Sequence, residues 1–211
     1  YGLENFAPEL PSDFTIGRLS PVEEFSRKVK GILVGLGFQE MMYNYLGSRR
    51  EYIDNMHISD EKCVFIANPM SENYEVIRPS VLPCLLESEA VSGHAVYPHS
   101  IFEVGKITIK DESDNSGTVT KDSLGFLSSN AHIGYNEAAS YVNTLMYFLR
   151  KEYTLGEVSG DERFIPGRAA QIIYNGKAVG IFGETHPQVL ESWGCSMPAI
   201  MCEIDLDALM A

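Results

Sequence analysis

The arginines are the residues in this sequence whose placement suggests chemistry most directly. A guanidinium can hold a phosphate or a carboxylate through two parallel hydrogen bonds, so an arginine near a strand is a candidate anion-binding group. The candidates close to expected strands are Arg78, Arg163 and Arg168. The expected strand from Ser100 to Ile109 carries no arginine. Any nucleotide phosphate held on this sheet would therefore depend on those three side chains.

The histidines offer weaker options. His94 and His99 precede Glu103, but this spacing matches no recognised metal-ligand pattern, and we expect no metal site. His186 follows a Gly-Glu-Thr tripeptide that begins at Gly183. Its imidazole could serve as a general base or could simply hydrogen-bond the turn before a helix, and the sequence favours the second role.

Other reactive patterns are missing from the sequence. It contains no Gly-x-Ser-x-Gly, phosphate-loop or Gly-x-Gly-x-x-Gly motif, so those mechanisms have no support. The four cysteines are not arranged as Cys-x-x-Cys, and we expect buried reduced thiols rather than a zinc or redox site. These residues are Cys63, Cys84, Cys195 and Cys202.

The overall composition limits the choice of partners. The chain has 211 residues, of which 45% are hydrophobic, and a formal net charge of −13. So acidic a chain is repelled by phosphate backbones, and we expect no direct DNA partner and any role with DNA or RNA to run through a partner. No transmembrane run or signal peptide is recognisable, so we expect a soluble, cytoplasmic protein without a membrane partner.

The stretch from Glu162 to Glu191 contains the strongest local signal. Two apolar runs, Ala170–Tyr174 and Ala178–Phe182, meet at Asn175-Gly176, which is typical of a type I′ hairpin turn. Pro187 then suits the first turn of a helix, and Gly194 suits its end.

A helix is expected from Ser20 to Leu36. Ser20 can cap it, Pro21 suits the first turn, and Glu23 completes a capping box. Gly37 ends it. An apolar stripe follows the helical period, and it could be core or a subunit interface, although periodicity alone favours core. The stripe consists of Val22, Phe25, Val29, Ile32, Leu33 and Leu36.

The remaining patterns predict an α+β fold. Helices are expected at Ser80–Ser92 and Glu137–Lys151, and the remaining expected strands are Phe38–Leu46, Cys63–Ala67, Tyr74–Arg78, Ser100–Ile109, Ser123–Ser128, Thr154–Ser159 and Ala199–Leu206. Few neighbours follow a βαβ alternation, which indicates an antiparallel sheet flanked by helices. We expect residues 1–17 to be a linker or the tail of a preceding domain, and residues 18–211 to be one domain.

Several segments, in this order, resemble a known family. Ile16 to Val29, with Gly37-Phe-Gln-Glu40, is similar to motif 1 of the class II aminoacyl-tRNA synthetases. More specific segments are similar to the β-chain family of phenylalanyl-tRNA synthetases, of the archaeal and eukaryotic-cytosolic type. They are Asn68-Pro-Met-Ser71, Val76 to Leu86, Phe102-Glu-Val-Gly-Lys106 and Gly183-Glu-Thr-His-Pro-Gln-Val-Leu190. The similarity covers nearly the whole chain and implies a piece of a longer subunit.

The resemblance implies a class II synthetase-like core domain that has lost catalysis. Catalytic class II domains carry an arginine in motif 2 that grips the α-phosphate, and Ile109 stands at that place here, with Asp111 at the place of the glutamate. The motif 3 equivalent near Glu203 also lacks arginine. Losing one donor aimed at transition-state charge typically costs on the order of 10²–10³ in rate. One departure is that the proline that usually closes motif 1 is absent between Met41 and Leu46.

The resemblance also implies partners and a vestigial cleft. The family's α-subunit charges tRNA(Phe) with phenylalanine, using ATP and Mg²⁺, inside an α2β2 heterotetramer, and this chain would need no cofactor itself. The expected cleft residues are Arg78, Glu103, Gly105, Ile109, Arg168, Gly183, Glu184 and His186. Two alternatives stay open: an active class II-type ATP-dependent ligase that uses Arg78 or Arg168, and a regulatory module that binds an amino acid or a nucleotide.

Overall fold

The computed structural model describes residues 2–13 and 16–211. Within them, a seven-stranded sheet runs in the order β1-β5-β6-β10-β9-β8-β7, and a three-stranded sheet runs in the order β2-β4-β3. The strands of the large sheet are β1 (Gln39–Glu40), β5 (His99–Lys110), β6 (Thr118–Ser129), β7 (Thr154–Glu157), β8 (Phe164–Tyr174), β9 (Lys177–Thr185) and β10 (Ala199–Asp205). The strands of the small sheet are β2 (Leu46–Gly47), β3 (Val64–Phe65) and β4 (Val76–Ile77). The helices are α1 (Pro21–Gly35), α2 (Leu82–Val91), α3 (Tyr135–Leu149), α4 (Pro187–Trp193) and α5 (Leu206–Met210), with short turns η1 (Leu3–Asn5), η2 (Arg50–Asp54) and η3 (Glu72–Tyr74).

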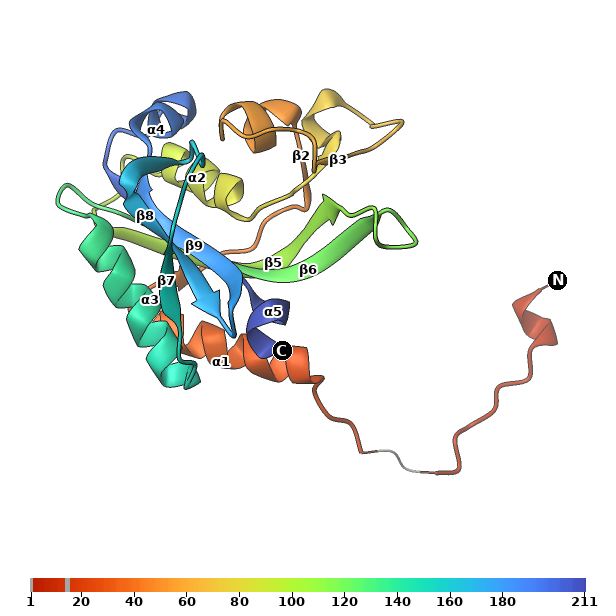
Figure 1. Cartoon of the computed structure of the whole chain (residues 1–211). Coiled ribbons are helices and arrows are strands. Elements are labelled where there is room, and N and C mark those ends of the chain that lie inside the picture. The colour runs from red at the N-terminus through yellow and green to blue at the C-terminus, as the bar shows by residue number, and fades with distance from the viewer. Residues whose placement is uncertain (1, 14–15) are drawn as a thin grey trace.

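Helices cover both faces of the large sheet (Figure 1). The helices α1, α3 and α5 lie on one side, whereas α2, α4 and the small sheet lie on the other. Each side has its own hydrophobic cluster, and the cluster under α2 and α4 includes Leu82, Leu85 and Val189. Residues 16–20, just before α1, lead away from this body.

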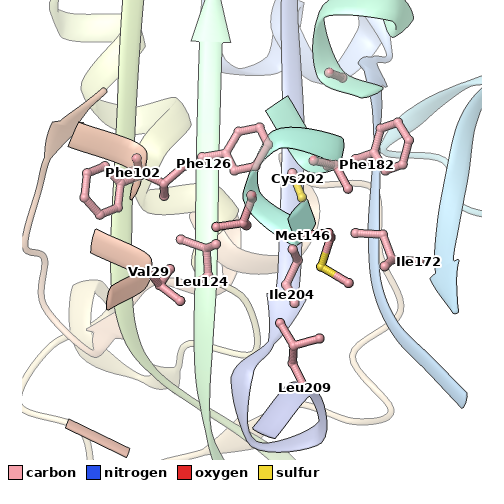
Figure 2. Close-up of a cluster of buried hydrophobic side chains, with 14 of the residues drawn as sticks. Val29, Phe102, Leu124, Phe126, Met146, Ile172, Phe182, Cys202, Ile204 and Leu209 are labelled. Carbon is pink, nitrogen blue, oxygen red and sulfur yellow. The ribbon is translucent and has the colours of Figure 1, made fainter. Parts of the chain in front are cut away.

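The larger cluster joins the sheet to α1, α3 and α5. Figure 2 shows Phe102, Phe126, Phe182 and Cys202, from four neighbouring strands, pointing toward the helices. All four are fully buried. Because apolar side chains at alternate strand positions face one side, each strand can pack this cluster while its other face packs beneath α2 and α4.

The expected fully antiparallel sheet is wrong at one edge. Strand β1 pairs with β5 in parallel, through Gln39 opposite Ile101 and Glu40 opposite Phe102. A parallel pair needs a long crossover, and the segment between β1 and β5, which contains the small sheet and α2, supplies it. The other neighbouring strands of the large sheet pair antiparallel, so the α+β expectation is confirmed with a mixed sheet.

The predicted hairpin is confirmed. Asn175 and Gly176 have φ values of 50° and 76° and connect β8 to β9, as a type I′ turn requires. The helix α4 then begins at Pro187, and Gly194 ends it with φ 73°.

Helix α1 is confirmed, with one change at its start. The Ser20 side chain accepts a hydrogen bond from the Glu23 backbone N–H, as predicted. The Glu23 carboxylate, however, pairs with Arg27 one turn later at 2.8 Å. The Glu23 carboxylate therefore binds Arg27 on the helix surface, and Ser20 provides the cap.

Several predicted elements differ in extent. Strand β6 begins at Thr118 rather than Ser123, and β3 and β4 are shorter than predicted. The strand expected over Phe38–Leu46 splits into β1 and β2, because the chain leaves the large sheet after Met41 to enter the small one. Helix α2 begins at Leu82, and the Ser80 hydroxyl accepts a hydrogen bond from the Leu82 N–H at 3.2 Å. Among the described residues, no helix combines the length and apolarity needed to cross a bilayer.

Candidate functional site

Arg78 and Glu103 form a buried ion pair beneath α2. Both nitrogens of the guanidinium fork donate to the carboxylate, at 2.8 and 2.9 Å, and the Arg78 side chain is fully buried. Its Nε donates to the Lys106 carbonyl at 2.8 Å, and the Tyr45 ring lies 4.5 Å from its Cζ. A Cβ at Gly105 would collide with the guanidinium, so glycine here leaves room for the Arg78–Glu103 pair. Arg78 thus donates its hydrogen bonds to acceptors of the same chain.

A second carboxylate, Glu203 on β10, keeps 14% of its side chain exposed and faces the start of α2. It accepts hydrogen bonds from the Val81 backbone N–H at 2.7 Å and from the Ser80 hydroxyl at 2.8 Å. Burial raises the pKa of Glu203, and the Arg163 charge and the hydrogen bonds from Val81 and Ser80 offset only part of this effect. The carboxylate ties β10 to the loop that precedes α2.

The two carboxylates occupy one row across the sheet. On the central strand β6, Gly125 lies opposite Glu103 on one side and opposite Glu203 on the other. A Cβ at Gly125 would lie 2.9 Å from the Cβ of Val81. Because Gly125 has no side chain, the start of α2 can rest directly on the sheet. We call Glu103, Gly125 and Glu203 the carboxylate row.

Arg163 is the second arginine near this row. Its Nε and Nη2 donate to both oxygens of Asp161 at 2.9 and 2.7 Å, and its Nη1 lies 3.9 Å from Glu203. Burial acts to raise the pKa of Asp161, but the hydrogen bond and the charge of Arg163 outweigh it, and this pKa is lowered. Like Arg78, Arg163 has a carboxylate partner from its own chain.

A separate group of predicted residues lies at the ends of β8 and β9. Arg168 donates to Glu184 at 2.7 Å and keeps 61% of its side chain exposed. The other Glu184 oxygen accepts from the Tyr135 backbone N–H at 2.9 Å, at the start of α3. A Cβ at Gly183 would lie 2.6 Å from the Arg168 carbonyl oxygen. These contacts hold the hairpin against α3.

The structure therefore divides the expected cleft into two groups. Arg78, Glu103 and Gly105 lie at β4 and β5, whereas Arg168, Gly183, Glu184 and His186 lie near β8 and β9, and strands β6 and β10 separate the two. Ile109 pairs with Val119 toward the end of β5 and joins neither group. Sequence reasoning left four residues out of the cleft: Gly125 and Glu203 of the carboxylate row, and Ser80 and Arg163, which contact Glu203. One signal in the sequence could have indicated the row: Glu203 is a charged residue within the otherwise apolar run of β10.

The histidines take structural positions. His186 accepts a hydrogen bond from the Gln188 backbone N–H through Nδ1 at 3.2 Å, within the first turn of α4. His99 pairs with Glu89 at 2.8 Å, while Glu103 pairs with Arg78. Over residues 2–13 and 16–211, His, Cys, Asp and Glu side chains form no group of three that could hold a metal ion.

The four cysteines are free thiols. Burial raises the pKa of each of them, for Cys195 to about 11. Such thiols stay protonated near neutral pH, which disfavours nucleophilic chemistry.

Part of the α1 interface expectation needs correction. Val29 and Leu33 are fully buried against the sheet and α3, so they offer a partner no surface. Phe25, Ile32 and Leu36 pack on the same cluster but keep partial exposure. The outward side of α1 instead presents Val34, which is 57% exposed.

Together, these contacts describe a sheet face that is already filled. Val81, Leu82 and Leu85 cover the carboxylate row and are fully buried. Both arginines that approach the row from the described part of the chain are paired with carboxylates. A phosphate would have to displace those partners and lift α2 from the sheet, so the arrangement favours structural support over anion binding.

Comparisons with known proteins give the family. Residues 7–206 match the model for the phenylalanyl tRNA synthetase beta chain CLM domain. Relatives named phenylalanine–tRNA ligase beta subunit include one from Borrelia hermsii, 46% identical over 209 residues, which are 99% of this chain and 37% of the relative. Others come from Borreliella burgdorferi (48% identical over 210 residues, 100% of this chain and 37% of the relative) and Treponema pallidum (46% over 208 residues, 99% and 34%).

The chain therefore spans little more than a third of these bacterial relatives. The match to the family model, in contrast, takes in α1, both sheets and the carboxylate row. The chain belongs to the phenylalanyl-tRNA synthetase β-chain CLM domain family.

Proposed function

We propose that this chain is the pseudo-catalytic class II-type core of a phenylalanine–tRNA ligase β-subunit. It assembles with the catalytic α-subunit in an α2β2 heterotetramer and supports that subunit while the whole enzyme charges tRNA(Phe) with phenylalanine. ATP and Mg²⁺ are used by the whole enzyme, and tRNA is contacted through the complex. The observation that carries this proposal is the filled sheet face, on which Arg78 and Arg163 already bind Glu103 and Asp161.

Electrostatics supports the inactive role. A guanidinium that must stabilise developing phosphate charge has to be preorganised and free to bind it. Ile109, at the expected place of the motif 2 arginine, is an apolar side chain on β5. The net charge of −13 also fits a chain that reaches tRNA through other parts of an assembly.

Two measurements test the proposal. The chain, mixed with an α-subunit from the same enzyme, is expected to elute as a complex on size-exclusion chromatography. The chain alone is expected to show no phenylalanine-dependent pyrophosphate exchange. Exchange at a rate above a boiled control would favour the alternative of an active class II ligase. Failure to form a complex, with the remaining domains of the β-subunit supplied, would contradict the assembly role.

The regulatory alternative has its own test. A module that binds phenylalanine or ATP must be stabilised by that ligand, so its melting temperature would rise with ligand concentration. We expect no shift for either ligand.

The type of β-subunit to which this chain belongs is also a proposal. We infer the archaeal and eukaryotic-cytosolic type from the segments around Val76 to Leu86 and Gly183 to Leu190, although the relatives described above are bacterial. Preferential assembly with an α-subunit of that type, over one of the other type, is the expected result.

A further inference from the structure

A surface groove lies on the outer side of α2, away from the carboxylate row. It encloses about 690 Å³ between α2 and the small sheet. Three tyrosines, Tyr43, Tyr52 and Tyr74, line it together with two glutamates, Glu51 and Glu87. We call this feature the tyrosine groove. Its volume lies within the range of sites that bind molecules larger than one side chain.

The helix wall of the groove is regular. Cys84, Glu87, Ser88 and Val91 all line it, and their spacing of three and four residues places them on one side of α2. Val81, Leu82 and Leu85 instead cover the sheet. The two sides of α2 therefore have different surroundings, and on the groove side Cys84 is buried in its own cluster with Tyr52 and Val76.

The two glutamates give the groove an uncompensated negative charge. No lysine, arginine or histidine is among the described residues that line it. Glu51 accepts hydrogen bonds from Ser48, whereas no hydrogen bond or ion pair to Glu87 occurs within the described chain. Burial, followed by the charge of Glu51, raises the pKa of Glu87. A bound cation would relieve this repulsion.

The tyrosines narrow the choice of cation. Tyr52 is 4% exposed and is held in place, and Tyr43 donates to Ser88 at 2.6 Å, so these rings form fixed walls. Aromatic faces attract cations, and arginine combines a planar charged group that stacks on rings with a fork that binds carboxylates. The groove thus has the chemistry that recognises an arginine side chain.

The rim indicates that the arginine belongs to a protein segment. Met42 and Val91 lie at the groove with 86% and 71% of their surfaces exposed. Apolar rims around a tyrosine and arginine contact are typical of protein interfaces. A nucleic acid is disfavoured because the groove and the whole chain are acidic.

We propose that the tyrosine groove is a docking site for an arginine-bearing segment of a partner protein, with the guanidinium between Glu51 and Glu87 and apolar neighbours on Met42 and Val91. The described lining of the groove does not involve α1, and it meets the carboxylate row only through Cys84, whose thiol contacts Arg78 at 3.8 Å.

The probe is a pair of capped peptides, acetyl-Leu-Arg-Leu-amide and acetyl-Leu-Gln-Leu-amide, titrated into the isotope-labelled chain by NMR. The arginine peptide is expected to shift the resonances of Tyr52, Tyr74 and Glu87. The glutamine peptide should bind at least about tenfold more weakly. Equal binding of the two peptides, shifts located elsewhere, or no shift at millimolar peptide would overturn the proposal.

Matched variants separate charge recognition from folding. Glu51→Gln with Glu87→Gln should weaken arginine-peptide binding by at least about tenfold while the melting temperature is kept. Glu24→Gln with Glu112→Gln, two exposed sites elsewhere, makes the same change in net charge and should leave binding intact. Equal losses in both pairs would mean attraction to net charge only, and would overturn the site.

Tyr74→Ala provides a second test, because Tyr74 is 47% exposed and its loss leaves the buried clusters intact. This substitution should weaken binding of the arginine peptide more than binding of the glutamine peptide. A second copy of the chain is the competing occupant. If light scattering showed a concentration-dependent dimer that Glu87→Gln abolished, the groove would hold a copy of itself and the partner proposal would fail.

Discussion

Arg78 and Glu103 join the small sheet to the large one through a two-armed ion pair that excludes water. The arginine follows β4, the glutamate lies in the middle of β5, and the two contacts measure 2.8 and 2.9 Å. A buried charge is tolerated only when it is paired and hydrogen-bonded. This pair therefore fixes how the segment before α2 enters the carboxylate row.

Breaking that pair should be costly. Glu103→Gln leaves the Arg78 charge buried without its counterion, and we expect the free energy of unfolding to fall by about 3–5 kcal/mol. Urea unfolding followed by circular dichroism measures the change. The apolar double variant Arg78→Met with Glu103→Leu should recover much of the loss, because it removes both charges together. A Glu103→Gln chain as stable as the original would contradict the structural role of the pair.

Gly125 gives a test of how closely α2 rests on the sheet. Gly125→Ala places a methyl group 2.9 Å from the Cβ of Val81, and overpacking of this kind typically costs about 1–3 kcal/mol. Gly31→Ala is the matched control. Gly31 lies inside α1 with open space around it, so alanine there should add about 0.4–1 kcal/mol. Destabilisation by Gly31→Ala, or tolerance of Gly125→Ala, would show that the packing differs from that described.

The acid dependence of stability should reflect Glu203. Its pKa is raised in the folded chain, mainly by burial, so folding favours the protonated carboxyl. The stability it contributes is fully present below the ordinary glutamate pKa of about 4.3 and is lost as the pH rises through the raised value. The unfolding free energy of the original chain minus that of Glu203→Gln should therefore decrease as pH rises over this window.

Asp161 provides a control of opposite sign. Its pKa is lowered because Arg163 outweighs the effect of burial, so its contribution is present at neutral pH and is lost as the pH falls through the lowered value. Urea unfolding of Asp161→Asn and Glu203→Gln over the same pH series should give slopes of opposite sign. Parallel slopes would mean that the two carboxyl groups do not titrate as the contacts imply.

Much of the fold was predictable where local chemistry decides the structure. Asn175-Gly176 can form its turn with few neighbours, and Ser20 and Pro21 begin α1 through contacts within one turn. The split of the strand expected over Phe38–Leu46 after Met41 was not predictable. Its two halves pair in different sheets, and the strands they pair with lie far away in sequence.

The candidate site was less predictable for a related reason. Residues near one another in sequence, such as Glu103 and Gly105, lie together beside Arg78. Glu203, however, meets Ser80 and Val81 across more than a hundred residues of chain. No periodic pattern in one segment indicates such a partner, and the pairing depends on strand order, which becomes known only when β10 inserts between β6 and β9.

The outward face of α1 gives the last prediction, which rests on the proposed assembly with the α-subunit. Val34 is 57% exposed beside Gly31, which has open space around it, whereas Leu33 is fully buried on the opposite side. If this face meets the α-subunit, Val34→Glu should weaken the complex by at least about tenfold, because a desolvated charge without a partner is unfavourable. The melting temperature of the chain itself should not change.

Affinity is measured by titrating labelled α-subunit and following fluorescence anisotropy. Met70→Glu is the matched control, since Met70 is 100% exposed and lies between β3 and η3, with the small sheet on the other side of the large sheet from α1. It should bind the α-subunit as the original chain does. Leu33→Glu should unfold the chain instead, because it buries a charge in the core. Normal binding by Val34→Glu would place the interface on another surface, and the partly exposed Val22 and Phe25 at the beginning of α1 would be the next positions to substitute.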